Sequence, residues 1–194
     1  MLIPHVILAV LVTGFPAQPD LQAVYAQGIT WQAFYDAADV RRELWRKNTE
    51  RAPSTVTADH VERLRKAGTG LTLLAVSEAA CSDSVNTVPF LAELSARAGI
   101  EMRIVGKAAA EPLLDAHRTP DGRTATPTVI LVRGGRDVGA WVERPAALQT
   151  WFLAATDVPL RERVERKMSW YEWDRGASTV ADFLAVVEAS ASRF

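Results

Sequence analysis

The chain has few of the residues that form disulfides or bind transition metals. Its 194 residues include one cysteine, Cys81, and three scattered histidines, His5, His60 and His117. One thiol cannot form a disulfide within a single molecule, so a disulfide-stabilised scaffold is excluded, as is a thiolate-rich metal site. We therefore expect no metal. Thiol chemistry, if present, must use an outside partner: glutathione, a client protein or a second copy of the chain.

The chain also lacks an excess of charge and a long hydrophobic run. Its net charge is −1, which gives no electrostatic reason to expect nucleic acid or an anionic membrane as a partner. The apolar residues 7–12 are enough for the core of a signal peptide but too few to span a bilayer. No Lys or Arg precedes them, and nearby sites fit the small-residue cleavage rule poorly. We expect residues 1–25 to be an apolar extension of a cytoplasmic protein with no integral membrane segment. Export to the periplasm through a weak N-terminal signal is the alternative.

The centre of the chain indicates an α/β domain. Apolar runs and helical periodicity predict strands at residues 71–77, 101–106, 128–133 and 137–142, and helices at 82–98, 111–117 and 146–155. The initial strand–helix–strand order requires parallel pairing through a right-handed crossover. Gly134-Gly135-Arg136 predicts a hairpin and hence an antiparallel pair. A mixed four-stranded sheet with helices on both faces satisfies both requirements.

Further helices are predicted on both sides of this centre. Thr30 can cap a helix whose buried face carries Trp31, Phe34, Tyr35, Ala38 and Trp45, and Thr57 can cap a second helix. Two more helices follow residue 159. The six tryptophans have helical spacing, which predicts that they seal these helices onto the core. The alternating charges of residues 161–167 predict a solvent-exposed face.

Three features stand at fixed places in this arrangement. Cys81 ends the first strand-to-helix turn, and Pro89 lies inside the following helix, where it would kink the axis. Thr126-Pro127 precedes the third strand, and a proline at a strand start is allowed because only its missing N–H must be accommodated.

With these features the chain resembles the thioredoxin superfamily from about residue 71 to residue 155. More closely, Ser77-Glu78-Ala79-Ala80-Cys81-Ser82-Asp83 resembles the S-E-x-W-C-G-D motif of an uncharacterised bacterial thioredoxin-like family. The loop Asp115-Ala116-His117 and the ending Trp170-Tyr171…Asp174-Arg175-Gly176 are similar too. The departures are Ala80, where a tryptophan is usual, and Ser82, where a glycine is usual.

The resemblance implies a thioredoxin-like fold in one domain of residues 26–194, with a core of 71–155 and added helices at 30–67 and 159–191. It also implies that Pro127 follows a cis bond and packs against the cysteine. The backbone of Thr126 would then be open to a bound peptide or to glutathione.

The candidate catalytic residues are Cys81, Ser84 and Asp83. A thiol at a helix N-terminus faces free N–H groups and the positive end of the helix dipole, which favours the thiolate. The Ser84 hydroxyl, one turn further on, can donate to that thiolate. The Asp83 carboxylate opposes a second negative charge nearby. The sequence therefore leaves the sign of the net effect open.

The candidate substrate-binding residues are Ser82, Thr126, Pro127 and Arg123. The Arg123 guanidinium suits a carboxylate of glutathione, although a loop arginine is more often simply solvated. His117 is a candidate acid or base, and its alternative role is a favourable charge at a helix C-terminus.

Two functions follow from the sequence. The first is monothiol thiol–disulfide exchange in cell redox homeostasis, with glutathione or a client protein as the external thiol and no bound cofactor. The alternative is a non-catalytic thioredoxin-fold module that binds a peptide or partner protein and in which Cys81 is a relic. The substrate, the reductant and the oligomeric state are open at this stage.

Overall fold

A computed structural model describes residues 20–192 of the chain. The apolar run predicted at residues 7–12 lies outside these described residues. Within them, no helix has both the length and the apolar character needed to cross a membrane.

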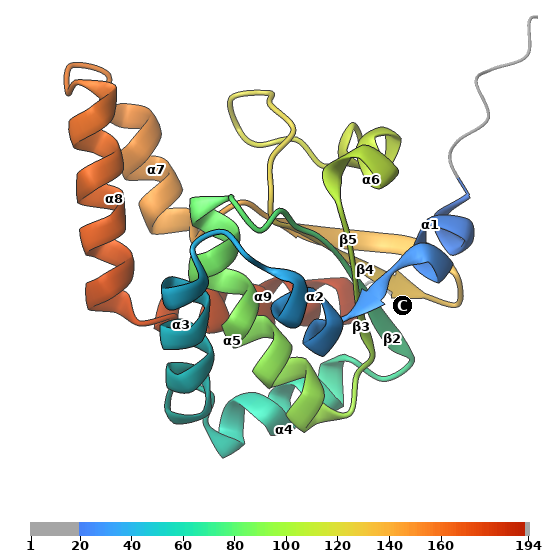
Figure 1. The fold of residues 1–194 in the computed structure, drawn as a ribbon. Helices are drawn as coiled ribbons and strands as arrows, with labels where there is room; N and C mark the ends of the chain where they lie inside the picture. Colours follow the sequence, from blue (N-terminus) through green and yellow to red (C-terminus); the bar gives the residue numbers. More distant parts are fainter. Residues whose placement is uncertain (1–19, 193–194) are drawn as a thin grey trace, which may run out of the picture.

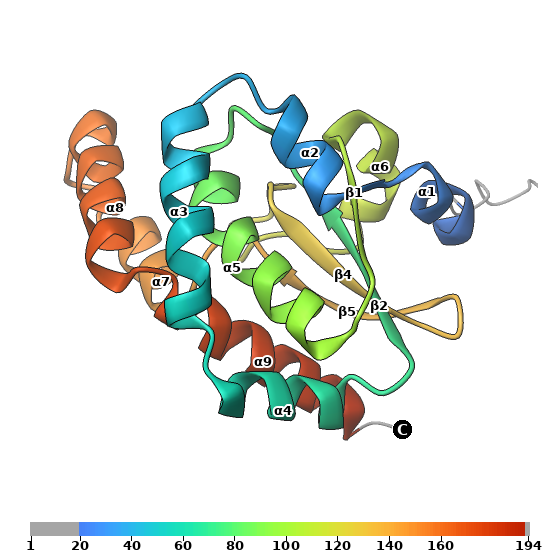
Figure 2. The same ribbon diagram turned by 60° about the horizontal axis from the view of Figure 1, so that its bottom comes forward.

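A mixed sheet in the strand order β1-β3-β2-β4-β5 forms the centre of the fold (Figures 1 and 2). The strands are β1 (Ile29–Thr30), β2 (Leu71–Val76), β3 (Met102–Val105), β4 (Thr128–Arg133) and β5 (Arg136–Val142). β2 and β3 are parallel, whereas β4 pairs antiparallel with both β2 and β5. The predicted α/β class is confirmed.

The sheet has five strands rather than the predicted four. The additional strand β1 pairs antiparallel with β3 through Ile29 and Ile104 and through Thr30 and Arg103. It contains two residues, too few to show a period-two pattern, so its pairing is set by where the neighbouring helices place it. The predicted hairpin is present between β4 and β5. Both of its glycines, Gly134 and Gly135, have positive φ, the conformation that a two-residue hairpin turn requires.

Each face of the sheet is covered by a separate apolar layer. Because side chains alternate along a strand, Leu71, Leu73 and Ala75 of β2 enter one layer and Leu74 and Val76 enter the other. The first layer is covered by α2 (Trp31–Ala37), α3 (Arg42–Thr55), α4 (Ala58–Ala67), α5 (Ser82–Ala98) and α9 (Ala177–Ala191). The second is covered by α1 (Leu21–Gln27) and α6 (Lys107–Leu114).

The N-terminal region contains two helices, α2 and α3, where the sequence predicts one continuous helix. Thr30 caps α2 as predicted, by accepting from the N–H of Ala33. However, α2 ends at Ala37 and α3 begins after Arg41, whose φ of 56° is left-handed and incompatible with a helix interior. No glycine marks this break, and the apolar spacing runs across it. Trp45 still joins the same aromatic cluster as Trp31 and Phe34.

Helix α6 lies earlier in the chain than predicted, at Lys107–Leu114 instead of residues 111–117. Gly106 caps it directly after β3, and the N–H of Lys107 donates to the Glu78 carboxylate at 2.6 Å. That contact fixes the first turn, and the helix former alanine fills the next three positions. Pro112 is accommodated inside the helix.

Helices α7 (Ala146–Ala154) and α8 (Leu160–Asp174) form an antiparallel pair beside the sheet. In Figures 1 and 2 they stand side by side at the left edge of the molecule, and α8 runs next to α3 before the chain turns into α9. This placement brings α8 close to the N-terminal end of α5, where Cys81 lies.

Candidate functional site

Cys81 is the N-cap residue of α5 and is half-buried. Its sulfur accepts a hydrogen bond from the N–H of Ser84 at 3.5 Å, and its thiol donates to the carbonyl of Thr126 at 3.1 Å. The thiol therefore bridges the start of the helix and the segment before β4. The thiolate would lose the bond to Thr126 but could still accept from Ser84.

The segment that faces the thiol contains a cis peptide bond between Thr126 and Pro127. The carbonyl of Pro127 accepts from the N–H of Glu143 at 2.7 Å, and the Thr128 hydroxyl donates to the Ala125 carbonyl at 2.8 Å. These bonds hold the segment on both sides of the proline. The structure thus brings Thr126 to Cys81 at the predicted site.

The turn that precedes Cys81 is held by α3. The indole Nε1 of Trp45 donates to the carbonyl of Ala79 at 3.1 Å. The guanidinium of Arg41 donates to the carbonyl of Ala80 at 2.8 Å. The added N-terminal helices therefore support the backbone of the thiol turn directly.

Ser84 contacts the thiol through its backbone rather than through its hydroxyl in this structure. Its hydroxyl is buried and has no hydrogen-bond partner among the described residues, whereas its backbone N–H bonds to the sulfur. The expected hydroxyl-to-thiolate bond is therefore not formed in this structure. The helix backbone makes the contact because Cys81, as the N-cap, faces the free N–H groups of the first turn.

Asp83 lies in a buried charged cluster. Its side chain is 7 % exposed and accepts three hydrogen bonds, from the ammonium of Lys167 at 2.7 Å, the hydroxyl of Tyr171 at 2.7 Å and the guanidinium of Arg144 at 3.3 Å. Sequence reasoning expected this carboxylate to oppose a thiolate. The two cations beside it offset that repulsion.

The prediction that residues 161–167 form a solvent-exposed face is wrong for Lys167. Its side chain is 5 % exposed, and its ammonium also donates to the Ser82 hydroxyl at 2.9 Å. Ser82, predicted to bind substrate, therefore has its hydroxyl directed at α8. Arg163 and Arg166, which precede Lys167 in the same run of alternating charges, show the same pattern, so no local signal distinguishes the buried cation.

The charged cluster continues from α5 toward β5 and α7. Arg144 bonds to the neighbouring Glu143 carboxylate as well as to Asp83, and both residues are buried. The guanidinium of Arg144 lies 4.5 Å from the ring centroid of Phe152, and that of Arg163 lies 5.2 Å from it. The ring thus provides a cation–π partner for arginines close to the site.

Tyr171 is held in its protonated form. Burial raises the pKa of its hydroxyl well above the usual value of 10.0, and the adjacent Asp83 carboxylate raises it further. The phenol is therefore a hydrogen-bond donor to Asp83 at every pH near neutrality. Tyr171, Lys167 and Arg144 were missed as site residues because they are 61 to 88 positions from Asp83 in the chain.

Two predicted residues already have partners elsewhere. The Arg123 guanidinium bonds to Asp121 at 2.5 Å and contacts Glu143 at 3.3 Å, and this pairing lowers the pKa of Asp121 to about 2. His117 lies 2.5 Å from the carboxylate of Asp137 on β5. Neither makes a hydrogen bond to Cys81. Among the described residues, no group of three or more His, Cys, Asp and Glu side chains could hold a metal ion.

The sequence model of the family described as thioredoxin matches residues 28–162. The chain belongs to the thioredoxin family. The match begins at β1 and ends in the first turn of α8, so it contains Cys81, Asp83 and the cis bond before Pro127. Lys167 and Tyr171, which bind Asp83, lie beyond it.

Two solved structures share this thioredoxin-family fold. A protein of unknown function from Pseudomonas aeruginosa is 20 % identical, with a TM-score of 0.65, and the alignment covers 86 % of this chain and 96 % of that one. An HIV epitope scaffold is 21 % identical, with a TM-score of 0.65, over 87 % of this chain and 97 % of that one. At this identity the likeness concerns the fold alone. No curated protein matches the chain.

This family member has exposed apolar side chains next to Arg41 and on α8. Val40, next to the Arg41 that holds the turn, is 46 % exposed. Leu160 and Val164 on α8 are 62 % and 37 % exposed, and they occupy the same helical face as Lys167 and Tyr171, at spacings of seven residues. Because Lys167 contacts Ser82, the first residue of α5, the earlier turns of α8 extend past the start of α5.

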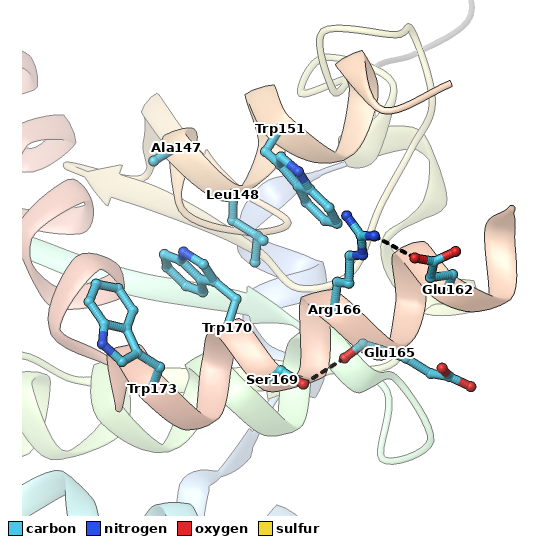
Figure 3. A pocket seen from close by; sticks show the side chains of 9 residues that line it. All are labelled: Ala147, Leu148, Trp151, Glu162, Glu165, Arg166, Ser169, Trp170 and Trp173. Atoms are coloured by element: carbon cyan, nitrogen blue, oxygen red, sulfur yellow. Dashed lines mark hydrogen bonds and ion pairs between the residues drawn. The ribbon is translucent and has the colours of Figure 1, made fainter. Parts of the chain in front are cut away.

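The opposite face of α8 lines a groove shared with α7, which we call the tryptophan groove (Figure 3). It has a volume of about 780 Å³ and is lined by Ala147, Leu148, Trp151, Glu162, Glu165, Arg166, Ser169, Trp170 and Trp173. The prediction that the tryptophans seal helices onto the core holds for the buried Trp45 and Trp141 and is wrong for Trp173, which is 76 % exposed.

Proposed function

We propose that this thioredoxin-family protein carries out monothiol thiol–disulfide exchange at Cys81. The observation that supports this most directly is the position of the thiol. Cys81 is the N-cap of α5, is partly accessible, and lies between the Ser84 N–H and the carbonyl before the cis-proline. A thiol in this position combines access for a partner sulfur with donors for the negative charge that develops on its own.

The reaction proceeds in two exchanges. The Cys81 thiolate attacks one sulfur of a disulfide, forms a mixed disulfide and releases the other sulfur as a thiolate, which takes up a proton. The thiolate of glutathione, or of a second protein, then attacks this mixed disulfide and releases Cys81. The external thiol supplies the second sulfur because the chain has no other cysteine.

The substrate in this proposal is a disulfide on a polypeptide. Val40 and, on α8, Leu160 and Val164 are exposed apolar side chains, which suit contact with the apolar side chains of a client polypeptide. Glutathione is then the releasing thiol. Its binding need not involve Arg123, whose guanidinium already contacts Asp121 and Glu143. A cytoplasmic location would provide glutathione in reduced form.

The proposal is tested by the reactivity of Cys81 in the folded and the unfolded protein. Iodoacetamide labelling of the native protein is compared with labelling in urea, and Cys81→Ser provides the blank. We expect faster labelling in the folded protein, because the helix start stabilises the thiolate. We also expect a mixed disulfide to form with oxidised glutathione and to be removed by reduced glutathione.

Labelling that is slower in the folded protein, or that needs denaturant, would contradict exchange at Cys81. That result would leave the non-catalytic binding module as the function of this site.

A matched variant, Ser82→Ala, tests whether the contact from α8 to Ser82 matters for exchange. It removes the bond donated by the Lys167 ammonium and keeps both hydrogen bonds of the thiol, so exchange should persist at a rate close to that of the wild type.

A further inference from the structure

Three cations converge on the ring of Phe152 beside the helix that carries the thiol. The guanidinium of Arg144 lies 4.5 Å from the ring centroid, that of Arg163 lies 5.2 Å from it, and the ammonium of Lys167 lies 5.7 Å from it. Lys167 in turn donates to the hydroxyl of Ser82, the residue that follows the cysteine. The group of cations therefore extends to the helix start at which the thiol lies.

This group contains one more cation than carboxylates. Asp83 pairs with Lys167 and Arg144, and Glu143 pairs with Arg144. Among the described residues, these two carboxylates are the ones that pair with the three cations. The loop arginine that also contacts Glu143 has an aspartate partner of its own, so it does not change the balance. One positive charge next to the thiol helix is left without a counterion.

Arg163 is the cation without a carboxylate partner. Its Nη1 donates to the carbonyl of Phe152 at 3.2 Å, and its Nε is buried without a hydrogen-bond partner. Its Nη2 makes no hydrogen bond with any described residue. The residue as a whole is partly exposed, so a ligand can reach it from solution. A planar guanidinium with free donors and no counterion is suited to a carboxylate.

We propose that Arg163 binds a carboxylate of glutathione when glutathione reacts at Cys81. The inference rests on the exchange reaction proposed above and assigns to Arg163 the role that sequence reasoning assigned to Arg123. A bound carboxylate supplies the negative charge that the group of cations lacks, and complementary charge of this kind selects one partner over another. Glutathione carries two carboxylates on a short peptide, whereas an uncharged thiol offers none.

The position of Arg163 suits a ligand of this size. Arg163 lies one turn before Lys167 on α8, about 5.4 Å along the helix axis, and Lys167 contacts the residue next to Cys81. An extended tripeptide spans about 10 Å, which is comparable with this separation. A peptide joined to the Cys81 sulfur and lying along the start of α8 therefore brings a carboxylate to the guanidinium.

Two disulfides that differ in their carboxylates test the proposal. The protein is treated with oxidised glutathione or with uncharged bis(2-hydroxyethyl) disulfide, and mass spectrometry follows the mixed disulfide. In both reactions the Cys81 thiolate attacks one sulfur and the other sulfur leaves as a thiolate, so the chemistry is the same. We expect Arg163→Met to slow the reaction with oxidised glutathione about tenfold and to change the other rate less than about twofold, as loss of one charge-assisted hydrogen bond predicts.

The ratio of the two rates isolates carboxylate binding, because a change in the thiol or in the fold alters both reactions. The matched control is Arg161→Met, which removes the same charge from α8. The Arg161 side chain is 92 % exposed and pairs with Glu165, so both rates should stay at the wild-type values. A binding measurement that needs no exchange uses S-methylglutathione, which should protect Cys81 from iodoacetamide in the wild type and not in Arg163→Met.

These measurements separate failure of the inference from failure of the exchange reaction. If the wild type reacts with neither disulfide, exchange at Cys81 is wrong, and protection by S-methylglutathione still reports on Arg163. The inference is overturned if Arg163→Met slows both disulfides equally or if Arg161→Met has the same effect on oxidised glutathione. It is also overturned if inorganic phosphate protects Cys81 as well as S-methylglutathione does, because the site would then accept any small anion.

Discussion

The ammonium of Lys167 lies 2.7 Å from the carboxylate of Asp83, and both side chains are buried. The pair joins the first turn of the thiol helix to a helix that lies mostly beyond the region matched by the thioredoxin family. Two buried charges in contact cost free energy to desolvate, and each depends on the other to offset that cost.

Removing the Lys167 ammonium alone should therefore destabilise the folded protein strongly. We expect Lys167→Met to lower the free energy of unfolding by about 3 kcal/mol, because the buried Asp83 charge is then offset only by Arg144 and keeps only the neutral hydrogen bond from Tyr171 beside it. Urea unfolding measures the change. Arg161→Met, on the exposed side of the same helix, should change it by less than about 0.5 kcal/mol. Equal effects of the two variants on the free energy of unfolding would show that the buried Lys167–Asp83 pair does not stabilise the protein.

Tyr171 should make the protein sensitive to alkali. Its pKa is raised in the folded state, so its contribution to stability is complete below about pH 10, the usual tyrosine value, and is lost as the pH rises above it. We expect stability measured by urea unfolding to fall more steeply above pH 10 in the wild type than in Tyr171→Phe. At neutral pH the variant should be less stable by about 2 kcal/mol, the value of a bond to a charged acceptor. If the stability of the wild type and of Tyr171→Phe fell equally steeply above pH 10, the alkaline loss of stability would not come from Tyr171.

A second cysteine at position 84 should convert the site to a dithiol. Residues three apart in a helix have Cα atoms about 5 Å apart, within the range that a disulfide spans, and the Ser84 N–H already contacts the Cys81 sulfur. We expect Ser84→Cys to lose two hydrogen atoms on mild oxidation, as seen by mass spectrometry of the monomer. Ser82→Cys is the control, because the side chain at 82 faces Lys167. An internal disulfide in the control and none in Ser84→Cys would mean that the helix start is misplaced.

Glu172 should contribute to stability at neutral pH and lose that contribution in acid. Its bonds to Arg51 and then Lys47 of α3 lower its pKa to about 2. The contribution is present above about pH 4.5 and disappears as the pH falls toward 2. Because the side chain is half exposed, we expect Glu172→Gln to cost less than about 1 kcal/mol at pH 7. The difference from wild type should vanish near pH 2, and an equal difference at both pH values would rule out an ionic origin.

The elements with local signals could be predicted from the sequence. β2, α5 and the β4–β5 hairpin follow from an apolar run, a helical period and a glycine pair, and they place Cys81 at the helix start. The expectations that failed depended on information that is not local. The break at Arg41 has no glycine, and β1 is fixed by its pairing with β3.

The sequence predicted which backbone segments meet at the candidate site, but it did not predict the charged side chains that surround Asp83. Cys81 and Thr126 meet as expected, because the fold determines their positions. The burial of Lys167 depends on Asp83, 84 residues earlier, and a charge alternation on a surface helix looks the same whether or not one member turns inward. The Ser84 hydroxyl makes no hydrogen bond to the sulfur in this structure, and the backbone N–H of Ser84 makes that contact instead.

The hydrogen bonds from Trp45 of α3 and from its N-cap residue Arg41 to the carbonyls of Ala79 and Ala80 have a practical consequence for work with fragments of this protein. A shortened chain that begins at β2 would contain the family motif and the cysteine, yet the peptide groups just before the thiol would be released to water. Transfer of the cysteine motif alone to another thioredoxin-family scaffold would have the same defect. The smallest transferable unit that keeps this thiol in place extends from Arg41, the N-cap residue of α3, through α8.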